Sequence, residues 1–84
     1  METIVVEPLP SGWSVRTDAI ENPMVFRSGS AAEDTAKGLA LKLARTGELV
    51  RLKLRLRNSV EARFICLPPL DTGGSPQLVQ LPDP

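Results

Sequence analysis

The sequence predicts an α+β fold, in which one helix packs on one face of an antiparallel β-sheet in the order β-β-β-α-β-β. Apolar and polar residues alternate in residues 13–17, 48–57 and 60–66, as in strands with one buried face. After residue 30 the apolar residues recur at helical spacing instead. The chain has 84 residues, so we expect one small domain with a thin core.

The first part of the chain predicts two strands and a short third one. Residues 3–7 are β-branched and apolar, and residues 13–17 alternate in polarity. We expect a loop over residues 18–23, because Pro23 interrupts regular structure. A short strand should follow over residues 24–28.

The single helix is predicted from its start signal and its apolar stripe. Ser30 and Glu33 have the spacing of a capping box, so the helix should begin at Ser30. Gly47 is placed to end it in the left-handed conformation. The apolar stripe consists of Ala32, Ala36, Leu39, Ala40 and Leu43. Leu41 falls roughly opposite this stripe and should be exposed, either as an isolated surface leucine or as a contact for a partner.

The two strands after the helix predict a hairpin with a three-residue loop. A loop over residues 57–59 keeps the apolar side chains of both strands on one face, with Leu52 opposite Phe64. A two-residue loop would mix apolar and charged side chains on each face. The three-residue loop also places Arg55 opposite Glu61, where the two side chains can form an ion pair.

The end of the chain is expected to be a tail. We predict a single domain over residues 1–67 and a flexible tail over residues 68–84. Residues 67–84 include five prolines and two glycines, a composition that does not favour a compact element. The alternative is that QLVQL, at residues 77–81, adds a strand to an exposed sheet edge.

Cations concentrate in the predicted hairpin, although the formal net charge of the chain is zero. Between Lys42 and Arg63, seven cations and two acids give a net charge of +5. The candidate residues for binding an anion or an acidic partner are Arg51, Lys53, Arg55, Arg57 and Arg63. The row is either a phosphate or partner site, or the solvated side of a strand that resists aggregation. Trp13 and Phe64 are expected to face inward, which disfavours base stacking on this face.

The composition disfavours catalysis. The chain has no histidine and no tyrosine, so the usual general base is missing. The single cysteine, Cys66, is expected to be buried and has no histidine to activate it. No group of carboxylates has the spacing of a metal site, and no phosphate-binding loop is present. We therefore expect no enzyme, no catalytic residue, no cofactor and no metal.

The sequence also predicts a cytoplasmic protein that does not enter a membrane. A single cysteine cannot form an internal disulfide, which fits a reducing compartment. The first residues do not resemble a signal peptide. No apolar run approaches the roughly 18 residues that a membrane span requires.

Several short stretches resemble a family of small bacterial proteins known only as a domain of unknown function. They are GWSV at residues 12–15, VFRS at residues 25–28, and Ala32-Glu33 opening an alanine-rich helix with a glycine after it. More loosely, residues 4–60 are similar to the N-terminal half of HicB-type antitoxins. The first resemblance implies a fold and no activity, and the second implies binding of a small toxin that attacks mRNA. The long cationic hairpin departs from the antitoxin pattern, as does the lack of a following DNA-binding segment.

Together these observations predict a small bacterial protein-interaction module without catalysis. The thin core and the segregated charges favour a homodimer. The alternative is an electrostatic binder of RNA or DNA that uses the basic hairpin, and its binding should weaken steeply with salt.

Overall fold

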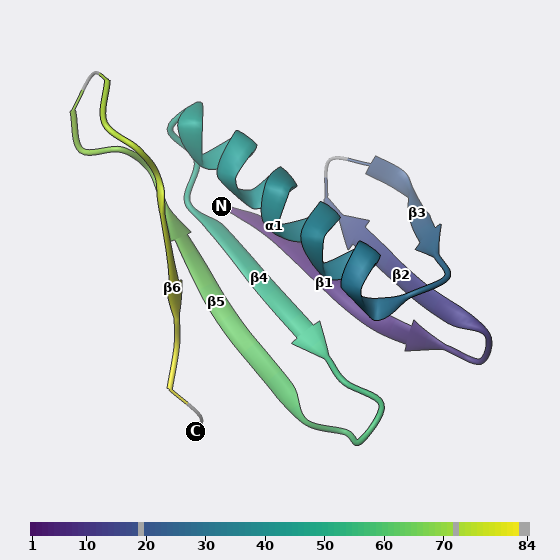
Figure 1. Ribbon diagram of the computed structural model, residues 1–84. Coiled ribbons are helices and arrows are strands. Elements are labelled where there is room, and N and C mark those ends of the chain that lie inside the picture. Colours follow the sequence, from purple (N-terminus) through teal and green to yellow (C-terminus); the bar gives the residue numbers. More distant parts are fainter. Residues whose placement is uncertain (19, 72, 83–84) are drawn as a thin grey trace.

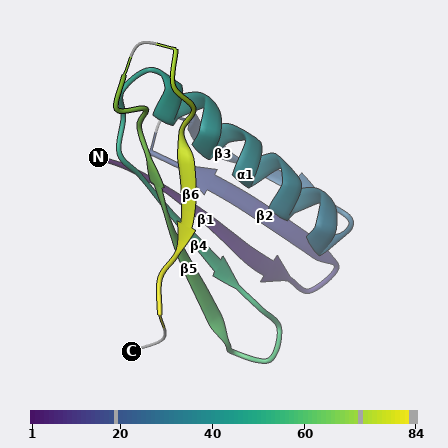
Figure 2. The same cartoon turned by 60° about the vertical axis from the view of Figure 1, so that its left-hand side comes forward.

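The computed structural model describes residues 1–18, 20–71 and 73–82. Figure 1 shows one helix lying across one face of a single sheet, which confirms the α+β class. Figure 2 shows that the helix covers only one side of this sheet. The elements are β1 (Glu2–Leu9), β2 (Gly12–Thr17), β3 (Ile20–Phe26), α1 (Gly29–Arg45), β4 (Val50–Arg55), β5 (Glu61–Leu67) and β6 (Gln77–Gln80).

The strands lie in the order β3-β2-β1-β4-β5-β6, with β1 and β4 at the centre. The sheet is mostly antiparallel, as expected, but β1 and β4 are parallel, with Ile4 beside Leu52. The expectation of a wholly antiparallel sheet is wrong at this pair. The chain reverses direction from β1 to β2, from β2 to β3, on entering α1 and on leaving it. Strand β4 therefore runs in the direction of β1 and can pair with it only in parallel.

Strand β3 replaces the loop expected over residues 18–23. It spans Ile20–Phe26 and pairs antiparallel with β2, with a register irregularity between Val15 and Thr17. Pro23 is compatible with this strand because β3 is at the edge of the sheet, where a missing N–H group needs no partner strand.

The helix begins two residues earlier than its sequence signal predicts. Ser28, not Ser30, is the N-cap, and its Oγ accepts a hydrogen bond from the backbone N–H of Ala31 at 3.1 Å. The next residue, Gly29, packs against the indole ring of Trp13. A Cβ atom on Gly29 would lie 2.9 Å from Cε2 of that ring, so only glycine allows the helix to start this close to β2.

A stripe of alanines forms the buried side of α1. Ala32, Ala36, Ala40 and Ala44 are all fully buried, whereas the expected stripe members Leu39 and Leu43 are only half-buried. Small side chains at every fourth position let the helix lie close to the sheet. Below it is one apolar layer made by Ile4, Val6, Val15, Val50, Leu52, Leu54 and Cys66. As predicted, Gly47 follows the helix in the left-handed region, with φ of 98°.

The β4–β5 hairpin has the predicted register. Leu52 lies opposite Phe64, and Arg55 lies opposite Glu61. The loop over residues 57–59 is closed by a hydrogen bond of 2.8 Å from the Leu56 N–H to the Val60 carbonyl. The three-residue loop is thus confirmed.

Part of the expected tail over residues 68–84 is a strand. Gln77–Gln80 forms β6, which pairs antiparallel with β5 and sends Leu78 into the core. The alternative of an added strand is therefore what the structure shows, and the sheet extends beyond the expected domain boundary at residue 67. Residues 72 and 83–84 of the expected tail lie outside the described residues.

Candidate functional site

The face of the sheet opposite α1 is open, and the alternation of apolar and cationic side chains along β4 places cations on it. Leu52 and Leu54 are buried beneath the helix. Arg51, Lys53 and Arg55 therefore project from the opposite side of the same strand. The helix covers one side only, so these cations are not packed under another element.

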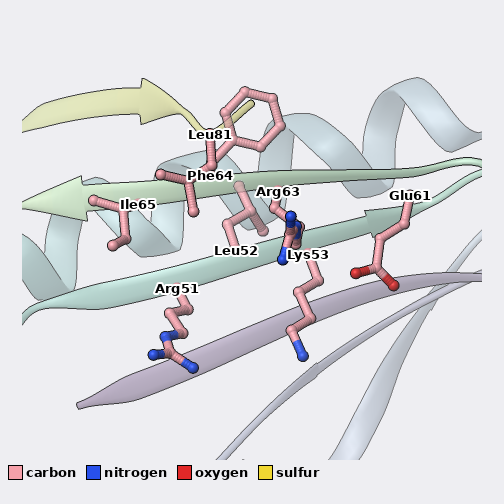
Figure 3. Close-up of a pocket in the computed structure, with 8 residues that line it drawn as sticks. All are labelled: Arg51, Leu52, Lys53, Glu61, Arg63, Phe64, Ile65 and Leu81. Atoms are coloured by element: carbon pink, nitrogen blue, oxygen red, sulfur yellow. The ribbon is translucent and has the colours of Figure 1, made fainter. Parts of the chain in front are cut away.

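A hollow of about 260 Å³ lies on this open face over β4 and β5 and at the end of β6. Figure 3 shows Arg51, Lys53 and Arg63 projecting on the open side, with Glu61 nearer the hairpin loop. Ile65 and Leu81 supply apolar surface at its other end. Its lining residues are Arg51, Leu52, Lys53, Glu61, Arg63, Phe64, Ile65 and Leu81. We call it the basic hollow.

The cations of the basic hollow have no acidic partner in the part of the chain that the structure describes. Among the described residues, Arg51, Lys53 and Arg63 form no ion pair with a carboxylate. Arg63 donates one long hydrogen bond of 3.4 Å to the Pro82 carbonyl. Lys53 and Arg63 lie directly opposite each other on paired strands, an arrangement in which like charges repel. A bound anion would relieve this repulsion.

Arg55 was predicted to join these cations, but carboxylates surround it. Its Nε lies 3.4 Å from Glu61, which confirms the predicted cross-strand ion pair. Its Nη1 lies 3.5 Å from Glu7 of β1, and Glu7 also pairs with Arg16 of β2. At this end of the open face, the carboxylates of the protein itself therefore neutralise the cations.

Arg57, another predicted site residue, is turned away from the basic hollow. Its Nη1 donates to the Leu9 carbonyl at 2.8 Å and its Nη2 to the Gly12 carbonyl at 2.9 Å. Its guanidinium carbon lies 5.0 Å from the centre of the Trp13 ring, within the range of a cation–π contact. Arg57 thus fastens the β4–β5 loop to the β1–β2 hairpin.

Leu41, the predicted partner contact, is not exposed. It is half-buried and packs against the core. Lys37, one turn earlier on α1, has its ammonium 5.5 Å from the Phe64 ring, so this flank of the helix faces β5. The expectation that Leu41 is exposed is wrong, because α1 lies so close to the sheet that both flanks of the alanine stripe are covered. That it contacts a partner stays a prediction.

The remaining reactive groups form no second site in the part of the chain that the structure describes. Cys66 is fully buried, and burial raises the pKa of its thiol. Residues 1–18, 20–71 and 73–82 contain no group of three His, Cys, Asp or Glu side chains that could hold a metal ion. Within the same residues, no helix has the length and apolar character needed to cross a bilayer.

The apolar end of the basic hollow was missed from the sequence. Ile65 was not considered as a site residue, and Leu81 belonged to the expected tail. A usable signal was the short apolar segment QLVQL between two prolines, because a strand there places residues 77, 79 and 81 on one face. All three aromatic side chains of the chain, Trp13, Phe26 and Phe64, pack against the core instead.

Comparison of the chain with known protein families, with curated proteins and with solved structures finds no match. The resemblances to the domain of unknown function and to HicB-type antitoxins therefore stay predictions.

Proposed function

We propose that this protein is a cytoplasmic, non-catalytic interaction module that binds an acidic segment of another protein on the open face of its sheet. One observation carries the proposal. Lys53 and Arg63 lie directly opposite each other, and with Arg51 they have no carboxylate partner among the described residues. The carboxylates of an acidic segment placed over this face could pair with all three cations.

The magnitudes indicate that charge alone is insufficient. Exposed ion pairs contribute about 0.2 to 1 kcal/mol each, so three of them supply at most about 3 kcal/mol. A micromolar complex requires about 8 kcal/mol. The rest must come from apolar contact, which Ile65 and Leu81 offer beside the cations. The preferred ligand is therefore a peptide in which acidic and aliphatic side chains alternate along one face of an extended chain.

Nucleic acid is the alternative ligand, because the repulsion between Lys53 and Arg63 would be relieved by a phosphate as well as by a carboxylate. The position of the aromatic side chains favours the peptide. Binding of single strands on open sheets relies on aromatic stacking, and all three aromatic rings of this chain pack on the helix side.

Fluorescence polarisation distinguishes the two ligands. The probes are a labelled peptide of Glu-Glu-Leu-Leu repeats and a labelled single-stranded oligonucleotide, each at low and high salt. The test variant is Lys53→Glu with Arg63→Glu. Its matched control is Lys42→Glu with Arg45→Glu, which makes the same charge change at exposed positions on α1.

We expect the peptide to bind the parent and the control, and to bind the test variant at least about tenfold more weakly, a loss of about 1.4 kcal/mol. Absence of peptide binding to the parent, or an equal loss in the control, would contradict the proposal. Salt-sensitive binding of the oligonucleotide without binding of the peptide would favour the alternative.

A further inference from the structure

The two edges of the sheet differ in how well they are protected from pairing. Strand β3 contains Glu21 and Pro23, and its pairing with β2 is irregular. Charge, proline and irregular register are the usual means by which an edge strand is kept from binding another strand. Strand β6, Gln77–Gln80, carries no charge and no proline. Figure 1 shows it at the edge of the sheet.

The hydrogen-bonding groups that β6 leaves free are fixed by its register with β5. The Leu81 N–H donates to the Arg63 carbonyl at 2.8 Å. In an antiparallel ladder, alternate residues turn their N–H and C=O groups toward the same neighbour. Val79 therefore also faces β5, whereas Leu78 and Gln80 direct their backbone groups outward from the edge.

Two prolines bound this free edge symmetrically. Pro76 and Pro82 flank β6, and each is three residues from Val79. Proline has no N–H to donate, so only Leu78 and Gln80 can both donate and accept at this edge. The segment PQLVQLP is thus an edge whose donors are arranged symmetrically about Val79.

We propose that two copies of this protein pair antiparallel through β6, with Val79 on the two-fold axis. Leu78 then faces Gln80 of the second copy, and each residue donates and accepts one hydrogen bond. Pro76 faces Pro82, where neither residue has a donor to leave unpaired. A shift of the register by two residues would set a proline opposite Leu78 or Gln80, and the carbonyl of that residue would then have no donor. In the proposed register only proline carbonyls have none.

The side chains at this seam suit a second copy. On the open face, Val79 meets Val79 across the axis, and Leu81 meets Gln77 of the second copy. Val79 is 42% exposed in the single chain, so pairing covers apolar surface. No charged residue lies in Gln77–Gln80, so identical edges meet without repulsion.

The proposed dimer has a defined overall arrangement. An axis perpendicular to the sheet puts both helices on one side and joins the two open faces on the other. One basic hollow then lies on each side of the seam. Dimerisation is measured without any ligand, so its failure would leave the proposed peptide binding untouched.

The first test is the oligomeric state of the full chain by sedimentation velocity, from low micromolar to several hundred micromolar. We expect a concentration-dependent dimer. Val79→Lys should raise its dissociation constant at least about tenfold, because two ammonium groups would meet at the axis. Val25→Lys is the matched control, since Val25 is a valine of the opposite edge strand, 66% exposed, and its replacement should leave the dimer unchanged.

The second test is cross-linking, which does not depend on how Val79→Lys folds. Opposed residues that are not hydrogen-bonded have Cα atoms about 4.5 Å apart, within the range of a disulfide. Under mild oxidation Val79→Cys should form a disulfide dimer, whereas Gln77→Cys should not, because residue 77 faces residue 81. Native Cys66 is buried and should not compete. A monomer at every concentration, a dimer unaffected by Val79→Lys, or equal cross-linking of both cysteine variants would overturn the proposal.

Discussion

The row of cations from Arg51 to Arg57 has similar sequences at its two ends, but among the described residues its cations are paired at one end only. Near the hairpin loop, Arg55 contacts two carboxylates, and Arg57 contacts two carbonyls and an indole ring. At the other end, Arg51 and Lys53 meet no carboxylate in the described part of the chain. The difference arises from the neighbouring strands, since β1 and β2 bring Glu7 and free carbonyls to one end only. A row of cations therefore indicates a binding face only where the cations are not already paired with other groups of the same protein.

The largest expected effect on stability comes from replacing a buried leucine that lies between these cations. Leu52→Ala should lower the free energy of unfolding by about 2 to 5 kcal/mol, because Leu52 is fully buried under α1. Leu56→Ala, near the loop, should cost less than about 1.5 kcal/mol, because Leu56 is 42% exposed. Urea unfolding of both variants measures the contrast. Equal losses would mean that α1 covers both ends of β4 alike.

Arg57→Ala should have the next largest effect. It removes two charge-assisted hydrogen bonds and a cation–π contact, and should cost about 1 to 2 kcal/mol. Arg51→Ala is the control and should change stability by less than about 0.5 kcal/mol. Urea unfolding followed by Trp13 fluorescence measures both. If the two variants were equally stable, the contacts of Arg57 would not fasten the loop.

Glu7→Gln should have a smaller effect on stability and a clear effect on binding. It removes one charge from the ion pairs with Arg16 and Arg55, at a cost of about 0.5 to 1 kcal/mol that high salt should reduce. It also removes one of the two carboxylates that contact Arg55 beside the basic hollow, so the acidic peptide should bind more tightly. Polarisation of the labelled peptide measures this, and weaker binding would contradict it.

The smallest effect on stability is expected from giving the free end an internal partner. Thr3 lies beside Arg51 in the parallel register, so Thr3→Glu should supply the missing carboxylate and stabilise the fold by no more than about 0.5 kcal/mol. The same change should weaken peptide binding. Thr3→Gln is the control for size, and it should bind the peptide like the parent.

The sequence predicts those parts of this fold that depend on alternation within a segment. The loop over residues 57–59 followed from keeping Leu52 and Phe64 on one face, and the ion pair between Arg55 and Glu61 followed from the same register. A shift of one residue would expose every buried leucine of β4, so the pattern determines the pairing.

Features that depend on distant segments could not be predicted in this way. From the sequence, Pro23 indicates a loop. A strand tolerates this proline only because β3 is at the edge of the sheet, and no local sequence pattern gives the strand order. The contacts of Arg57 join residues 48 and 45 positions apart in the sequence. Leu81 reached the basic hollow only because β6 pairs with β5. The sequence thus identified the cations of the site, but it could not tell which of them are paired with other groups of the protein.

The parallel pairing of β1 with β4 also imposes an order of assembly on the chain. The hairpins β1–β2 and β4–β5 join residues that are close in sequence and can form quickly. The central pair must wait until α1 has crossed the sheet, because closing so long a loop loses more chain entropy than either hairpin does. We therefore expect the centre of the sheet to form late. Until it does, both hairpins expose their apolar faces. The protein is therefore most prone to aggregate at this slow step, in which the two halves join.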